Sequence, residues 1–140
     1  MKALIGLAAA SLFALAACGP SAVAGATATQ VNATLGDNMR IVVNRDTVPT
    51  GIVSFTVKNA GATTHEIVVI KTDGAIDSIA PDPDEAGKVS EENSVGESGD
   101  MDAGTTKTFQ LTLDPGKYIL ICNEPGHYMA GMRIPFTVTK

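Results

Sequence analysis

The sequence has no tryptophan and only two cysteines and two histidines among its 140 residues, so few side chains can bind a soft metal ion. Beyond the N-terminus it has no long stretch with the 3.6-residue period of an amphipathic helix, which excludes a helical bundle. The net charge is −5 at pH 7, and this excess of acidic residues excludes nucleic acid as a partner because the phosphates would be repelled.

The N-terminal residues have the features of an export signal. Lys2 precedes an apolar run over residues 3–17 that contains no acidic residue and is short for a membrane span. The run ends in Leu-Ala-Ala-Cys, which resembles a bacterial lipobox, a motif whose cysteine carries lipid after cleavage. We therefore predict a signal peptide over residues 1–17 and a lipidated Cys18, which would anchor the exported protein to a membrane at the periplasm or cell surface. Cleavage at Ala22-Val23-Ala24 is the alternative, and it would release a soluble protein.

The remainder of the chain alternates between β-type runs and turns. Residues 18–34 are small and polar and predict a lipid-anchored tether, which leaves residues 35–140 as one domain with a single core. Apolar and polar residues alternate from Val53, from Phe109 and from Ile134, and further β-rich runs cover residues 39–44, 66–71 and 117–122. Pro135 indicates that the last strand lies partly at the edge of a sheet. Seven or so short strands separated by turn residues predict an all-β sandwich.

Residues 73–102 interrupt this pattern with a strongly acidic insertion. It has ten acidic residues and one basic residue, Lys88, which gives it a net charge of −9. A solvated acidic loop is one interpretation, and a docking surface for a basic partner is the other. Either interpretation allows a short helix within residues 75–90.

Cys122 is the single cysteine of the predicted domain. If Cys18 carries lipid or is removed, Cys122 has no disulfide partner within the chain, which leaves a reactive thiol, an intermolecular bridge, a metal-bound thiolate or a buried core residue. His127 and Met132 follow it in one loop at C-x4-H-x4-M spacing. His65, the other histidine, heads an earlier β-rich run that can reach the same end of a sandwich. A thiolate, two imidazoles and a thioether are the parts of a His2Cys site with a weak axial methionine, which favours copper electron transfer.

Other interpretations use some of these residues. A cysteine and a histidine could be the nucleophile and base of a hydrolase, but no oxyanion site or orienting group accompanies them. Zinc accepts the same ligands, although a structural zinc site usually has more thiolates and no thioether. Each histidine could be a solvated loop residue and each methionine a core residue. Only the four residues together favour copper.

The segment Cys-Asn-Glu-Pro-Gly-His from Cys122 to His127, followed by Gly131-Met132, resembles the ligand loop of the blue copper proteins, or cupredoxins. The Cys-x-x-Pro-Gly-His part is similar to azurin, and the four-residue gap to methionine is closer to rusticyanin and sulfocyanin. The resemblance implies an eight-stranded Greek-key sandwich that binds one copper ion. It also implies that His65, Cys122 and His127 are the equatorial ligands and that Met132 is the axial ligand.

Three residues beside the expected ligands are predicted to tune the site. The backbone N–H groups of Glu66 and Glu124 are placed to donate toward the Cys122 sulfur. By analogy with the family, the side chain of Asn123 is expected to hold the loop around His65 against the ligand loop.

The predicted function is single-electron transfer, by a monomer that cycles between Cu(I) and Cu(II), with a redox partner such as a c-type cytochrome or an oxidase. The electron would pass through the exposed edge of His127, surrounded by Pro125, Gly126 and Met129, where a partner docks transiently. A copper chaperone or copper-buffering protein is the alternative, and a non-redox lipoprotein that binds zinc or another protein is a third reading. We do not expect an enzyme, because four protein ligands leave no open coordination position.

Overall fold

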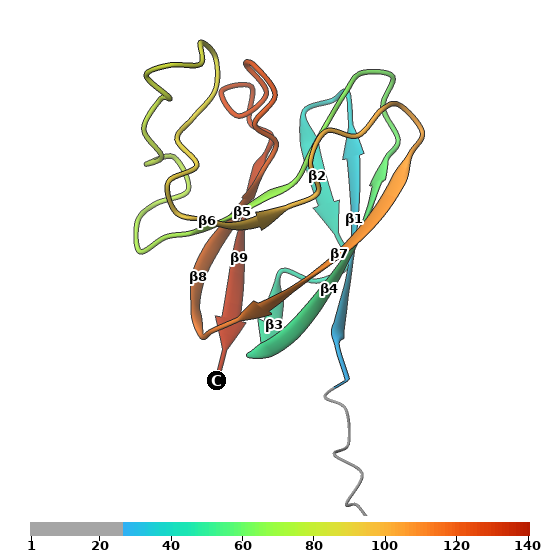
Figure 1. Cartoon of the computed structure of the whole chain (residues 1–140), viewed down its shortest axis with the longest axis vertical. Coiled ribbons are helices and arrows are strands. Elements are labelled where there is room, and N and C mark those ends of the chain that lie inside the picture. The colour runs from blue at the N-terminus through green and yellow to red at the C-terminus, as the bar shows by residue number, and fades with distance from the viewer. Residues whose placement is uncertain (1–26) are drawn as a thin grey trace, which may run out of the picture.

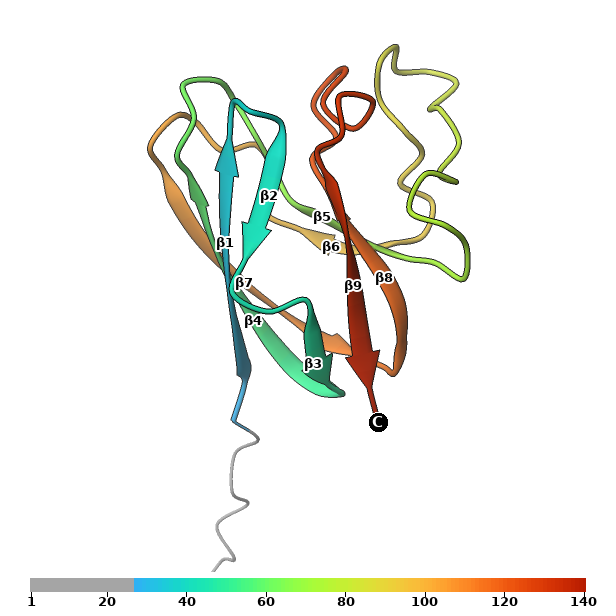
Figure 2. The ribbon, with the colours of Figure 1, turned by 180° about the vertical axis from the view of Figure 1, so that it is seen from behind.

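The computed structural model describes residues 27–140, and the predicted signal peptide and Cys18 lie outside this part of the chain. Its nine strands form two β-sheets that pack face to face (Figure 1, Figure 2). The strands are β1 (Thr29–Gly36), β2 (Arg40–Val43), β3 (Thr47–Pro49), β4 (Gly51–Asn59), β5 (Val68–Lys71), β6 (Ser94–Glu97), β7 (Thr106–Leu113), β8 (Gly116–Ile121) and β9 (Arg133–Thr139). One sheet has the order β2-β1-β4-β7 and the other β3-β9-β8-β5-β6. The predicted all-β sandwich is therefore confirmed.

Two of the nine strands were not expected from the sequence pattern. β3 is only three residues long and ends in Pro49, and it pairs in parallel with the end of β9. β6 lies within the acidic insertion, where Gly96 and Glu97 break any apolar alternation, and it pairs with β5. For β3 and β6, pairing with neighbours rather than local pattern decides where the strand forms. β1 begins at Thr29, so residues 29–34 of the predicted tether are part of a sheet, and the alternation of Val31, Ala33 and Leu35 with polar residues places these three side chains in the core.

Aromatic side chains fill the centre of the core between the two sheets. Phe55 of β4 stacks on Phe109 of β7 at a centroid distance of 5.1 Å, and it contacts Phe136 of β9 at 5.6 Å. Such pairs contribute about 0.5–1.5 kcal/mol beyond the burial of their surface. Pro135 of β9 pairs with β8 only, because the three residues of β3 pair with β9 further along the strand. This part of β9 lies at an edge, as predicted.

The acidic insertion packs on the outer face of β5 and β8 and lies beside the ligand loop (Figure 1). It contains no helix, because Pro81 and Pro83 remove backbone donors that a helix would need, so the helix suggested within residues 75–90 does not form. Instead, its apolar side chains form a second, smaller core with β5, β8 and the ligand loop: Ile76, Ile79 and Val89 pack with Val68, Ile70, Ile119, Ile121 and Tyr128. The insertion is therefore attached to the domain by apolar packing. No helix among residues 27–140 is long and apolar enough to cross a membrane.

Candidate metal centre

A single loop carries three of the four predicted ligands. β8 ends at Ile121, and the next side chain, that of Cys122, is fully buried in the core. The backbone N–H of Cys122 donates to the carbonyl of Met132 at 3.0 Å, and the N–H of Met132 donates to the carbonyl of His127 at 3.0 Å. Gly126 turns the loop with a φ of 84°, a conformation that other residues rarely adopt. These bonds hold the thiol, the imidazole and the thioether on one rigid loop.

His65 reaches the same end of the sandwich from the chain between β4 and β5. Its backbone N–H and carbonyl both bond to the backbone of Met101, at 3.2 and 2.8 Å. Asn59, fully buried at the end of β4, donates its side-chain N–H groups to the carbonyls of Thr63 and Met101 at 2.8 Å each. Because a broken bond here would leave a buried polar group unpaired, these contacts fix the loop that carries His65.

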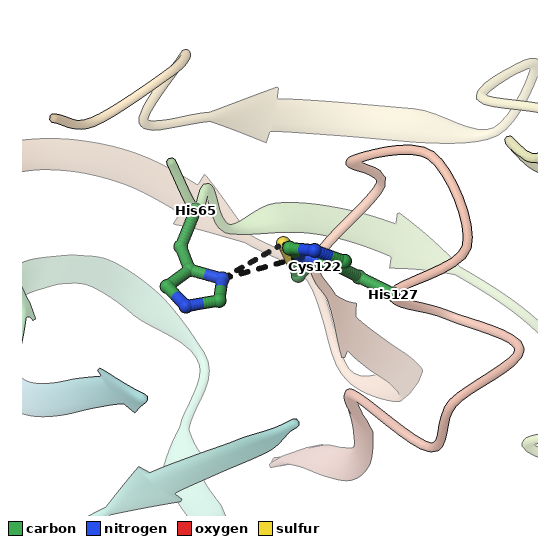
Figure 3. Close-up of side chains that lie close together, drawn as sticks. All are labelled: His65, Cys122 and His127. Atoms are coloured by element: carbon green, nitrogen blue, oxygen red, sulfur yellow. Dashed lines mark hydrogen bonds between the residues drawn. The ribbon is translucent and has the colours of Figure 1, made fainter. Parts of the chain in front are cut away.

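Three donor atoms, His65 Nδ1, Cys122 Sγ and His127 Nδ1, converge on one point (Figure 3). The two Nδ1 atoms are 3.2 Å apart, and Cys122 Sγ lies 3.8 Å from His65 Nδ1 and 3.4 Å from His127 Nδ1. An ion at the centre of this triangle would lie about 2 Å from each atom, close to the length of metal–imidazole and metal–thiolate bonds. Among residues 27–140, no other group of three His, Cys, Asp or Glu side chains converges in this way. The residues fit copper, since a thiolate with two imidazoles is the donor set of blue copper sites.

Met132 completes the predicted ligand set. It is fully buried, and its two backbone hydrogen bonds tie it to Cys122 and His127. A thioether is a soft and weak donor, so a buried methionine beside these residues can serve as the axial ligand of such a site.

The Cys122 thiol lies in a setting that keeps it protonated until a metal ion binds. Burial raises its pKa to about 11, although the backbone N–H groups of Glu66 and Glu124 act in the opposite direction. The Glu66 N–H donates to Cys122 Sγ at 3.4 Å, as predicted. This N–H group therefore cannot pair with a neighbouring strand, which agrees with the start of β5 at Val68. Burial also lowers the pKa of His127. Both shifts favour neutral side chains, so metal binding must displace the thiol proton.

Asp37, which the sequence analysis did not single out, holds the imidazole of His65 from behind. His65 Nε2–H donates to Asp37 Oδ1 at 3.1 Å, which leaves the lone pair on Nδ1, the atom that faces the other donors. The same carboxylate accepts bonds from the N–H groups of Ala62 and Thr63 and from the Thr63 hydroxyl. These donors, Ala62 foremost, hold the pKa of Asp37 far below its usual range. A Cβ at Gly61 would collide with this carboxylate, so glycine is required there.

Asn123 does not hold the loop around His65, so that prediction is wrong. Its side chain bonds to the acidic insertion instead: Oδ1 accepts from the Val89 N–H at 2.9 Å, and Nδ2 donates to the Val89 carbonyl at 2.9 Å and to the Glu91 carboxylate at 2.6 Å. Side chains alternate along an extended chain, so when Cys122 points into the core its neighbour points away from it. The loop around His65 is held by the buried Asn59 instead, whose side chain bonds to Gly61 and Thr63 of that loop and to Met101.

The residues predicted to dock a partner lie around His127. Met129 is 72% exposed and Pro125 is exposed, while Gly126 is half-buried because its N–H donates to the carbonyl of Gly87 at 2.8 Å. Of the three convergent donor residues, only His127 has appreciable solvent contact. Gly87 belongs to the acidic insertion, so this insertion borders the same surface.

Comparisons with known proteins agree with this geometry. The sequence matches the family described as "Sulfocyanin (SoxE) domain" over residues 17–140. Reduced auracyanin from Roseiflexus castenholzii is 27% identical, with a TM-score of 0.63 over 81% of this chain and 98% of that chain. Auracyanin A from Chloroflexus aurantiacus, described as a "blue" copper protein, is 23% identical, with a TM-score of 0.61 over 81% and 100% of the two chains. Rusticyanin from Thiobacillus ferrooxidans is 18% identical, with a TM-score of 0.60 over 79% and 76%. A search of curated proteins found no significant match.

We expect Asp37→Asn to weaken copper binding and to raise the reduction potential. The amide can still accept the His65 hydrogen bond, but it lacks the negative charge that favours Cu(II) over Cu(I). Loss of such a partner costs roughly 10- to 100-fold in metal affinity. Competition with a copper chelator measures the affinity, and voltammetry measures the potential. Asp114→Asn, at an exposed turn, is the matched control, and equal potentials for both variants would show that Asp37 only supports the loop.

The metal-free protein is expected to lose stability between pH 9 and pH 11. The thiol of Cys122 has a pKa of about 11 in the folded protein against an ordinary value of 9.0. Over this interval the unfolded state therefore binds fewer protons, and the free energy of unfolding falls as the pH rises. A shift of this size corresponds to about 2–3 kcal/mol. Urea unfolding of the metal-free protein and of Cys122→Ser across this interval measures the difference, and parallel curves would contradict it.

Proposed function

Since the chain belongs to the sulfocyanin (SoxE) domain family and is a blue copper electron-transfer protein, we propose that it passes single electrons between redox proteins outside the cytoplasm. The observation that carries this proposal is the convergence of two imidazole nitrogens and one thiol within 3.2–3.8 Å of one another. Donor atoms that are held in place before the metal arrives resist the rearrangement that each oxidation state would otherwise prefer.

The type 1 copper site of this protein consists of His65, Cys122, His127 and Met132. Copper bound there supplies a one-electron couple between Cu(I) and Cu(II). The chain contributes a fixed set of donors and excludes water from them, since the side chains of His65, Cys122 and Met132 are fully buried. Four protein ligands leave no position for a substrate, so the protein is an electron carrier and not an enzyme.

The surface around His127 is the proposed point of electron entry and exit. His127 connects the buried site to solvent, and the exposed side chain of Met129 lies two residues further along the loop. A small apolar patch of this kind supports weak and short-lived docking, which a carrier needs in order to exchange partners. We propose a c-type cytochrome or an oxidase as the class of partner.

The predicted export signal and the lipobox-like sequence before Cys18 support a location at the periplasm or cell surface, with a lipid anchor in the membrane. β1 enters the sandwich at the end opposite the ligand loop (Figure 1). An anchor on the N-terminal side would therefore leave His127 free to face a partner.

Burial of the soft ligands favours electron transfer over copper delivery. A chaperone hands its metal to another protein, so its sulfur ligands must be reachable, whereas Cys122 and Met132 have no solvent exposure. Within residues 27–140 the one strongly exposed methionine is Met129, which is too little for an exposed methionine cluster.

Addition of Cu(II) to the purified protein is expected to give an intense blue or green thiolate charge-transfer band. The band requires the sulfur of Cys122 on copper, so Cys122→Ser should abolish it. Met101→Leu is the matched control, because this buried methionine bonds to His65 through its backbone and is not a proposed ligand. A colourless product with tight Cu(I) binding would instead indicate copper delivery, and absence of copper binding would contradict both functions.

Replacement of Met129 by lysine should slow electron transfer to a c-type cytochrome and leave the colour unchanged. The charge disrupts the apolar patch without touching a ligand, and the rate is expected to fall by roughly tenfold. Stopped-flow mixing of the reduced protein with the oxidised cytochrome measures the rate. Val42→Lys on β2, also at an exposed apolar residue, is the control. Loss of colour in the Met129 variant would place that side chain in the site and contradict the assignment.

A further inference from the structure

A second feature of the molecule lies between the metal centre and the acidic insertion. It is a cavity of about 340 Å³, and six of the side chains that line it are carboxylates: Glu66, Asp82, Glu85, Glu91, Glu97 and Asp100. The one basic side chain in its lining is Lys88, which pairs with Glu85 at 2.6 Å. The cavity therefore keeps a large excess of negative charge that the electron-transfer site does not use.

Glu66 is the unusual member of this group. It is 6% exposed, and no N–H or O–H group of residues 27–140 donates to its carboxylate. No fully buried polar side-chain atom of residues 27–140 lacks a hydrogen-bond partner, so the oxygens of Glu66 keep some contact with the cavity. A carboxylate with so little water and no donor is costly to bury. A cationic group placed in the cavity would provide the partner that the protein itself does not supply.

The walls of the cavity are fixed to the ligand loop. Asn123, which also lines the cavity, forms two hydrogen bonds with the backbone of Val89 at 2.9 Å and one with Glu91 at 2.6 Å. The Gly126 N–H bonds to the carbonyl of Gly87 at 2.8 Å. These contacts hold the insertion against the ligand loop, so the cavity and the proposed site of electron exchange border the same loop.

The shape of the cavity indicates which cation it suits. A bare Ca²⁺ ion binds oxygen atoms at about 2.3–2.6 Å, so its ligand oxygens must lie within roughly 5 Å of one another. Within residues 27–140, no three of these carboxylates converge so closely, since the only convergent group is that of His65, Cys122 and His127. The volume is also that of roughly ten water molecules. A guanidinium or ammonium group, which spreads several donors over a larger space, fits this arrangement better.

We propose that this cavity receives an arginine or lysine side chain of the protein with which this chain exchanges electrons. The proposal rests on the proposed function and adds the chemistry of the partner: a basic side chain in the cavity, in addition to the apolar contact at Met129. Surface charge pairs of this kind speed up encounter and orient the partner, while the apolar patch makes the close contact. The acidic insertion is then part of the docking surface and not only a solvated loop.

The proposal can be tested by NMR titration of the Cu(I)-loaded full chain with the peptide acetyl-Gly-Arg-Arg-Gly-amide, with acetyl-Gly-Glu-Glu-Gly-amide as the control ligand. The arginine peptide is expected to shift the amide signals of Glu97, Gly99 and Asn123 in a saturable way, and the glutamate peptide is not. The double variant E97Q/D100N removes two cavity charges and should weaken the binding by roughly fivefold or more. The matched control D84N/E92Q removes two charges of the same insertion whose side chains are exposed and do not line the cavity, and it should bind as the parent does.

Two results would overturn the proposal. Equal weakening of peptide binding in both double variants would mean that the peptide binds through the overall charge of the insertion and not in the cavity. Saturable shifts with calcium chloride at micromolar concentration, without shifts from the arginine peptide, would mean that the cavity is an ion site. Each sample is then oxidised to the Cu(II) form, and the thiolate charge-transfer band and the reversible one-electron reduction are recorded. Failure of docking with an intact band is thereby separated from failure of the proposed function.

Discussion

Three donor atoms must be held together in a buried space before any metal ion joins them, and the rest of the site depends on this constraint. Two imidazole nitrogens lie 3.2 Å apart, and a thiol that burial keeps protonated lies beside them. A hydrogen bond from the thiol or from a ring N–H can join these neutral groups only weakly, so the surrounding backbone must hold all three atoms together. The ligand loop does so through its internal N–H bonds, and the loop after β4 does so through the buried side chain of Asn59.

The same requirement shapes elements that look unrelated to the metal. The Glu66 N–H serves the sulfur of Cys122, and β5 begins only at Val68. Asp37, held as an anion by four hydrogen-bond donors, fixes the orientation of the His65 ring, and glycine at position 61 makes the approach possible. On the other side, the acidic insertion packs on the outer face of β5 and β8 and bonds to the ligand loop. The acidic insertion therefore supports the ligand loop and also borders the exposed surface around His127.

The features that the sequence predicts correctly depend on the spacing of residues close together in the chain, or on a residue type that occurs only once or twice. The C-x4-H-x4-M pattern lies within one loop, and His65 is the only other histidine, so four ligands could be named without any knowledge of the fold. Alternation along β4, β7 and β9 predicts the sandwich.

What sequence reasoning missed depends on contacts between distant segments. Asp37 lies in a Gly-Asp-Asn turn, where aspartate is common for local reasons. β3 and β6 form only because β9 and β5 offer edges to pair with. Asn123 was misassigned because analogy cannot tell which neighbour an outward side chain will meet.

Crystal structures of the metal-free and copper-loaded protein test the central claim most directly. If the fold holds the donors in advance, Nδ1 of His65, Nδ1 of His127 and Sγ of Cys122 should keep their mutual positions within roughly 0.5 Å between the two forms, with the ion between them. If removal of copper lets either histidine move by roughly 2 Å or more, the metal and not the fold assembles the site, and this account of the protein would be contradicted.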